Sequence, residues 1–208
     1  NVFLFINRIH NAFFDIFMSA FSGKLVWIPM YASILYVMLR NFHWKVTLLC
    51  VIGLVLTVTF ADQVCATLIR PNVERLRPSN LDNPLSEMVH IVNNRRGGRY
   101  GFPSCHAANT FGLAFYLFFL FRKRGLTLFI MAWALLTCYS RVYLGVHYPG
   151  DLLTGAVVGL AGACIFYRLF VKTSRYKRTE PVVHVYAPAL TGGLTVAGIL
   201  IYAAINVV

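Results

Sequence analysis

Apolar residues in this chain fall into six long runs that contain no charged side chain. These runs cover residues 25–39, 46–61, 107–121, 125–140, 152–167 and 185–208. Several are only 15 or 16 residues long, and as helices they would measure roughly 23 Å, short of the roughly 30 Å hydrocarbon core of a bilayer. The helices must therefore extend past their flanking charges, which then reach the interface or a polar pocket. The pattern predicts an all-α integral membrane bundle of about six transmembrane helices.

The segment before the first run, residues 2–21, is apolar at most positions but also contains Asn7, Arg8, His10, Asn11 and Asp15. Such a mixture is typical of an interfacial or steeply tilted helix. The only long polar segment covers residues 70–102, and a loop of this length is usually functional. We see no internal repeat, so we expect one membrane domain over residues 1–208, with its catalytic motifs within residues 70–151. The first residue is Asn rather than Met, as expected of a trimmed chain.

Composition supports the membrane interpretation. Charged residues make up 12% of the 208 residues and hydrophobic residues 58%, whereas soluble domains usually contain about 25% charged residues. A soluble protein with buried helices would not have this composition. The five cysteines include no CxxC pair, so no disulfide framework is predicted.

The net charge of +12 could suggest a nucleic-acid ligand, but the positions of the charges argue against it. Basic residues at 40–45, 122–124 and 168–178 fall in alternate connections between the predicted spans, so they share one side of the membrane. The positive-inside tendency makes that side cytoplasmic. Arginines on the opposite side run against this tendency, and an anionic ligand would explain them; they are Arg70, Arg75, Arg77, Arg95, Arg96 and Arg99.

Three polar clusters are predicted on this outer side. They are the segment from Arg70 to Arg77-Pro78, the tetrapeptide Pro103-Ser104-Cys105-His106, and the segment that runs from Ser140-Arg141 through His147 to Asp151. Arginine has a planar fork of donors that suits phosphate oxygens. The second cluster begins a predicted span, and a helix N-terminus attracts anions. Together the clusters predict a cradle for a phosphoryl group.

Two histidines and a carboxylate could perform the covalent chemistry in this cradle. His147 could attack phosphorus, while Asp151, four residues later, accepts a hydrogen bond from the other ring nitrogen and fixes the tautomer. His106 could protonate the leaving oxygen and later activate water. The acidic residues of this side are dispersed among arginines, so we predict no metal site and no cofactor. Asp151 could also cap a helix after Pro149-Gly150.

The three clusters resemble the motifs of the type 2 phosphatidic acid phosphatase family, which is related to the vanadium haloperoxidases. Its membrane members use K-x6-RP, PSGH and SR-x5-H-x3-D. Arg70 stands in place of the lysine of the first motif and Cys105 in place of the glycine of the second, while Ser140 to Asp151 match the third completely. The resemblance implies phosphate binding by Arg70, Arg77, Ser104, Cys105 and Arg141. It also implies that His147 is the nucleophile, that Asp151 orients His147, and that His106 is the acid.

Several positions lie outside these roles. If the position of Cys105 requires a positive φ, its side chain would strain the start of the helix. Arg95, Arg96 and Arg99 could contact the substrate head group or be plain loop charges. Asp62, an acid within a span, is expected to pair with an arginine such as Arg70 or Arg75.

The sequence therefore predicts a lipid phosphatase of a bacterial inner membrane, with its active site on the extracytoplasmic side. A polyprenyl (undecaprenyl) pyrophosphate carrier is the first choice of substrate, because the additional arginines suit more than one phosphate. Phosphatidylglycerophosphate, phosphatidate and lipid A are the alternative substrates. Transfer of the phosphate to another lipid and a non-enzymatic lipid-binding or transport protein are the alternative functions. The expected partners are the substrate lipid and the bilayer, with no nucleic acid and no obligatory protein partner.

Overall fold

The computed structural model describes residues 2–176 and 182–207, and their regular secondary structure is helical. The helices are α1 (Val2–Asn7), α2 (Ala12–Phe21), α3 (Ile28–Asn41), α4 (Trp44–Gln63), α5 (Arg70–Val73), α6 (Cys105–Phe121), α7 (Arg124–Tyr143), α8 (Pro149–Ser174) and α9 (Ala187–Ile205), with short helical turns at Leu25–Trp27, Val64–Ile69, Ser86–Met88 and Val92–Asn94.

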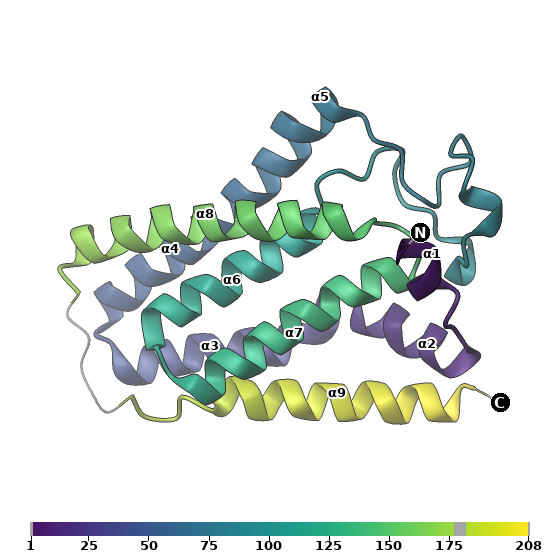
Figure 1. Ribbon diagram of the computed structural model, residues 1–208. Coiled ribbons are helices and arrows are strands. Elements are labelled where there is room, and N and C mark those ends of the chain that lie inside the picture. Colours follow the sequence, from purple (N-terminus) through teal and green to yellow (C-terminus); the bar gives the residue numbers. More distant parts are fainter. Residues whose placement is uncertain (1, 177–181, 208) are drawn as a thin grey trace.

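The long helices run side by side along one axis (Figure 1). Four stretches of the described chain are long and apolar enough to cross a membrane: Trp44–Val73, α7, α8 and α9. The pair Ala12–Phe21 and Leu25–Asn41, bent by 68°, makes a fifth if it is one span. The remaining apolar run is α6, which is shorter at 17 residues. The all-α membrane bundle predicted from the sequence is confirmed.

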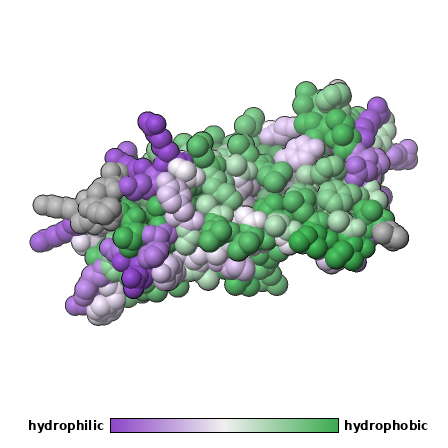
Figure 2. Space-filling model, turned by 90° about the horizontal axis from the view of Figure 1, so that it is seen from below, coloured by the Kyte–Doolittle hydropathy of each residue, from purple (hydrophilic) through white to green (hydrophobic). Residues whose placement is uncertain are grey.

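The surface agrees with this assignment. Figure 2 shows apolar side chains along the length of the molecule and hydrophilic side chains gathered toward its ends. Many large apolar side chains are exposed on the spans, among them Leu48, Leu135, Leu153 and Leu194. Exposed leucines are costly in water but favourable in lipid, so this face suits the hydrocarbon core.

The sequence predicted one interfacial or steeply tilted helix for the N-terminal segment, whereas the structure has two helices there. The segment forms two short helices, because residues 8–11 break the pattern between α1 and α2. Asn11 caps α2 by accepting a hydrogen bond from the backbone N–H of Phe14 at 2.9 Å. Polar side chains that compete for backbone hydrogen bonds favour such caps over helix interiors.

Glycines allow α8 to lie close to α6. A Cβ atom at Gly159 would collide with the backbone of Ala108 and Gly112, and one at Gly155 would lie 2.5 Å from the carbonyl oxygen of Ser104. Small residues at a helix interface are the usual means by which membrane helices pack without polar contacts. This packing matters for function because it brings the start of α6 against the start of α8.

The three predicted clusters lie at one end of the bundle. The connection from α5 to α6 and the turn from α7 to α8 lie at the right of Figure 1, near α1 and α2. The turns from α3 to α4 and from α6 to α7 lie at the opposite end. The structure thus separates the catalytic motifs from the basic turns around Arg40, Lys45 and Arg122–Arg124.

Candidate active site

The second and third clusters are joined by backbone contacts. The N–H of Ser104 donates a hydrogen bond to the carbonyl oxygen of Asp151 at 3.0 Å. Ser104 is also the N-cap of α6, where its hydroxyl accepts from the N–H of Ala107 at 3.4 Å. The hydroxyl of Ser104 is therefore engaged in the cap, and Ser104 is fully buried.

The long loop places the first cluster by pairing its two ends. The N–H of Arg77 donates to the carbonyl oxygen of Arg99 at 3.1 Å, and the N–H of Gly101 donates to that of Arg75 at 2.9 Å. An isolated β-bridge joins Leu76 to Tyr100 between these bonds. Gly97, with φ of +73°, and Gly101 leave the space that the Arg77 side chain occupies. The loop thus turns Arg77 inward, where it is largely buried.

His147 lies between Arg77 and Asp151. Nη1 of Arg77 is 2.9 Å from Nε2 of His147, and Nδ1 of His147 is 3.2 Å from Oδ2 of Asp151. A guanidinium has donors only, so Nε2 must accept and the ring proton must be on Nδ1, where it is donated to Asp151. This tautomer leaves the Nε2 lone pair facing the arginines.

Electrostatics keep His147 neutral. Its side chain is only 2% exposed, and burial lowers its pKa well below the ordinary value, with Arg77 and Arg141 lowering the pKa further. Burial also lowers the pKa of Arg77 to about 10, with repulsion from Arg70 as the next cause, so Arg77 is still cationic at neutral pH. A neutral imidazole beside fixed cations is suited to attack an anion that the cations hold.

Asp151 makes both contacts that the sequence suggested as alternatives. Its Oδ2 accepts the hydrogen bond from His147 and another from the N–H of Tyr148 at 2.9 Å, which closes a capping box at the start of α8. Its Oδ1 forms an ion pair with Nη2 of Arg75. Arg75 in turn lies over the rings of Phe102 and Tyr148, with its guanidinium carbon 4.6 Å and 5.3 Å from their centroids. Asp151 is fully buried, and Arg75 compensates its charge.

A polar cavity of about 180 Å³ lies where these clusters meet. Its walls contain four basic side chains and two histidines; they are Lys24, Asp62, Arg70, Arg77, Cys105, His106, Asn109, Arg141 and His147. Within the described chain, the buried Nε atoms of Arg70, Arg77 and Arg141 make no hydrogen bond. Buried donors without partners are rare in folded proteins, and a phosphate could satisfy several of them.

The two departures from the family motifs contact each other. Nη2 of Arg70 donates to the sulfur of Cys105 at 2.9 Å and to the carbonyl oxygen of Pro103 at 3.0 Å. Cys105 is the first residue of α6 and is not among the residues with positive φ. The condition for strain at this position, a positive φ, is therefore not met, because the backbone is helical there.

The three arginines of the loop tip lie outside the polar cavity. Arg95 lines a separate cavity of about 200 Å³, together with Ser19, Ser22 and Arg141. Nη1 of Arg96 donates to the carbonyl oxygen of Ser79 at 2.9 Å. Arg99 is 64% exposed and lies 3.6 Å from Asp82. Arg96 and Arg99 have partners within the loop. Arg95 lines a different cavity, although Arg141 lines both that cavity and the polar one.

The prediction that Asp62 pairs with an arginine was wrong. Oδ1 of Asp62 accepts a hydrogen bond from the side-chain amide of Asn109 at 3.0 Å, and Arg75 pairs with Asp151 instead. Asp62 and Asn109 both line the polar cavity, so their contact links α4 to α6 at its wall.

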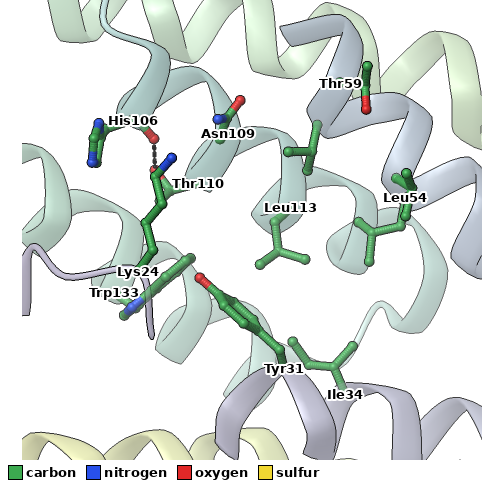
Figure 3. A pocket seen from close by; sticks show the side chains of 12 residues that line it. Lys24, Tyr31, Ile34, Leu54, Thr59, His106, Asn109, Thr110, Leu113 and Trp133 are labelled. Atoms are coloured by element: carbon green, nitrogen blue, oxygen red, sulfur yellow. Dashed lines mark hydrogen bonds between the residues drawn. The ribbon is translucent and has the colours of Figure 1, made fainter. Parts of the chain in front are cut away.

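An apolar cavity of about 440 Å³ adjoins the polar one. Lys24, His106 and Asn109 line both cavities, and Figure 3 shows apolar side chains such as Tyr31, Ile34 and Leu113 around the rest of the space. The two cavities together place a cationic pocket next to an apolar space within the bundle. This arrangement suits a ligand with a phosphate attached near an acyl or prenyl chain.

A second histidine cluster lies near the catalytic end but has a different geometry. Nε2 of His90 is 2.8 Å from Oδ1 of Asp15, which also accepts from the hydroxyl of Tyr143 at 2.7 Å. The ring of His10 stacks on that of His90 with centroids 3.5 Å apart and an angle of 3°. A nitrogen lone pair lies in its ring plane, so two parallel rings at this spacing do not direct lone pairs at one ion. The cluster connects the N-terminal segment to the long loop.

Sequence reasoning missed Lys24, Arg75 and Asn109 as parts of the site. Arg75 was considered as an outer arginine and as a partner of Asp62, not of Asp151, and Asn109 lies in an apolar run. Lys24 precedes the first predicted span and is far in sequence from the motifs. Of these three residues, only Asn109 could have been identified from the sequence, because a polar residue within an apolar run suggests a functional position.

Comparisons with known proteins agree with the geometry. Residues 44–175 match the model of the PAP2 superfamily. A lipid A 4′-phosphatase of Bacteroides thetaiotaomicron is 54% identical, and the match covers 98% of this chain and 94% of that protein. A lipid A 4′-phosphatase of Porphyromonas gingivalis is 32% identical over 82% of this chain and 72% of that protein. The crystal structure of Aquifex aeolicus LpxE superposes with a TM-score of 0.59 at 21% identity, covering 80% of this chain and 93% of that one.

Proposed function

Because the chain belongs to the PAP2 superfamily, whose members include membrane lipid phosphatases, we propose that it removes the 4′-phosphate of lipid A through a phosphohistidine intermediate. One observation carries the proposal. Nε2 of His147 accepts a hydrogen bond from Arg77 at the wall of an arginine-lined cavity, while Asp151 holds the proton on Nδ1. A nucleophile held in this tautomer and oriented by a buried carboxylate follows the logic of a catalytic triad.

The reaction proceeds in two displacements. The lone pair of His147 Nε2 forms a bond to phosphorus as the bond from phosphorus to the ester oxygen breaks, and His106 donates a proton to the departing oxygen. Water then attacks the phosphohistidine, loses a proton to His106 and breaks the P–N bond. The products are the dephosphorylated lipid and inorganic phosphate, and both histidines return to their initial states.

The arginines supply the charge that this chemistry requires. Negative charge in phosphoryl transfer is spread over three equatorial oxygens, and Arg70, Arg77 and Arg141 surround the cavity beside His147. A phosphate in the cavity would also favour the imidazolium form of His106, because an opposite charge nearby stabilises the charged form. We propose that hydrolysis therefore needs no metal ion.

Lipid A is favoured over the polyprenyl pyrophosphate that the sequence alone suggested first. Two relatives named as lipid A 4′-phosphatases match most of this chain. The loop arginines that suggested a second phosphate are in part engaged elsewhere, since Arg96 bonds to Ser79 and Arg99 lies near Asp82. The polar cavity next to an apolar space is compatible with a phosphomonoester on an acylated head group.

We propose that the reaction takes place at the extracytoplasmic leaflet. The cavity and the motifs lie at the end of the bundle opposite the turns around Arg40, Lys45 and Arg122–Arg124. Basic residues in short turns mark the cytoplasmic side. The catalytic end then faces the other compartment of a bacterial inner membrane.

A substrate panel tests the proposal. Purified protein would be given lipid A, undecaprenyl diphosphate, phosphatidate and phosphatidylglycerophosphate in mixed micelles, with phosphate release and lipid mass as readouts. Lipid A is expected to lose one phosphate, at the 4′ position, at the highest kcat/KM. Preference for undecaprenyl diphosphate would overturn the substrate assignment. Phosphate recovered on a second lipid rather than in solution would identify a transferase.

A further inference from the structure

Lys24 lies in the short connection between α2 and the helical turn Leu25–Trp27, where two helices meet at 68°. It lines the polar cavity with the three arginines and also lines the apolar cavity. In Figure 3 its side chain extends from this connection toward the start of α6, where His106 and Thr110 lie. The bend therefore carries a cation from the N-terminal segment to the junction of the two cavities.

The residue that begins the first motif, Arg70, is partly engaged in contacts within the protein. The lysine that begins the family motif is Arg70 here, and Nη2 of Arg70 is committed to Pro103 and the sulfur of Cys105. One nitrogen of Arg70 is thus engaged in hydrogen bonds to the start of α6. Lys24, by contrast, lies outside residues 44–175, which match the family model, so none of the three motifs includes it.

The excess of positive charge in the polar cavity suits an anionic ligand. Its walls contain four basic side chains, Lys24 among them, and one carboxylate, Asp62, which is bonded to Asn109. A phosphomonoester dianion and the charge that develops during its transfer match this excess of positive charge. An ammonium on a flexible stem acts as a point charge that can follow a phosphate oxygen, whereas the arginines act as fixed forks.

We propose that Lys24 is a fourth phosphate-binding residue, which supplies a lysine from the connection after α2 and holds the phosphate at the junction with the apolar cavity. The methylene stem of Lys24 faces the apolar cavity, and its ammonium binds a phosphoryl oxygen beside His106. The inference rests on the proposed function only in that a phosphate occupies the polar cavity. It does not depend on which lipid carries that phosphate.

Kinetics of Lys24→Gln and Lys24→Arg test the inference. Lys24→Gln removes the charge at similar length and should lower kcat/KM for lipid A by about 10- to 100-fold, the size expected for one charge-assisted hydrogen bond. Lys24→Arg keeps the charge and should recover most of the activity. Lys45→Gln, at the start of α4 on the opposite end, is the matched control and should equal the wild type.

A binding measurement separates the role of Lys24 from the identity of the substrate. Orthovanadate should raise the thermal unfolding midpoint of the wild type and of Lys45→Gln, and the rise should be much smaller for Lys24→Gln at the same concentrations. This readout compares each variant with itself, so a general loss of stability does not imitate it. Unchanged vanadate stabilisation and unchanged kcat/KM in Lys24→Gln would overturn the inference. Inactivity of the wild type toward lipid A, with the vanadate difference intact, would overturn only the substrate assignment.

Discussion

Nη1 of Arg77 donates a hydrogen bond to the lone pair of His147 Nε2, and the two nitrogens are 2.9 Å apart. The same nitrogen of Arg77 also donates to the carbonyl oxygen of Val146 at 3.0 Å. Attack on phosphorus needs this lone pair, so the mechanism we propose requires Arg77 to leave Nε2 of His147 first. In the mechanism we propose, Arg77 therefore exchanges its hydrogen bond to Nε2 of His147 for one to the phosphate.

His147→Gln should abolish turnover, because no other group in this position can form the covalent bond. Loss of a nucleophile costs many orders of magnitude, and we expect a fall of at least about a thousandfold. The measurement is phosphate release from lipid A, with size exclusion in detergent as a control for folding. Wild-type protein quenched in single turnover should carry an alkali-stable, acid-labile phosphate that the variant lacks. Near-normal turnover by His147→Gln would exclude the mechanism.

Asp151→Asn should slow the reaction by about 10²- to 10⁴-fold, because an amide can hold His147 in the wrong tautomer. Arg75→Gln is the comparison, since it removes the ion pair of Asp151 but leaves the hydrogen bond to His147. We expect Arg75→Gln to be considerably more active than Asp151→Asn. Equal losses in the two variants would assign Asp151 a purely structural role. Thermal unfolding midpoints of both variants show how much of each loss reflects stability.

The pH dependence of phosphohistidine formation should reflect the low pKa of His147. Protonation removes the Nε2 lone pair, so activity falls as the pH drops through the pKa of this imidazole. Burial and the neighbouring arginines place that pKa below the ordinary value of 6.5. The acidic limb of the single-turnover rate should therefore lie well below pH 6.5, after correction for ionisation of the substrate phosphate. A limb centred at or above pH 6.5 would contradict the assignment.

Activity should persist in excess EDTA, because arginines rather than a metal ion neutralise the phosphate. Orthovanadate should inhibit by occupying the polar cavity in a five-coordinate form, and inhibition should be competitive with lipid. Complete loss of activity in EDTA with recovery on addition of Mg²⁺ would refute metal-independent hydrolysis. A mock-treated sample kept in the same detergent controls for slow inactivation.

Labelling of single cysteines can determine the sidedness of the active site. In a background that lacks the five native cysteines, cysteine at the exposed Asn94, in the long loop, should react with a membrane-impermeant maleimide in intact cells. Cysteine at the exposed Lys172, in the last turn of α8, should react only after permeabilisation. The reverse pattern would place the active site in the cytoplasm.

The sequence by itself determined the membrane fold and pointed to many of the residues that the structure brings together at the candidate site. Uncharged apolar runs predict spans because a helix in lipid must satisfy its backbone internally and present apolar side chains. The sequence places Asp151 four residues after His147 and just inside a helix start, and the structure joins the two side chains there, since His147 precedes the N-cap of α8 and Asp151 lies in its first turn. These inferences succeeded because they depend on local geometry.

Only the tertiary structure decided which distant residues complete the site. Arg75 and Asp151 pair through a loop that folds back on α8, Asp62 chooses Asn109 over an arginine, and Lys24 arrives from a bend between helices. None of these contacts leaves a periodic or spacing signal, since each depends on the path of a loop or on how closely two helices pack. In α6 and α8 that distance depends on glycines whose backbones touch, and a sequence pattern records the glycines without recording what they approach.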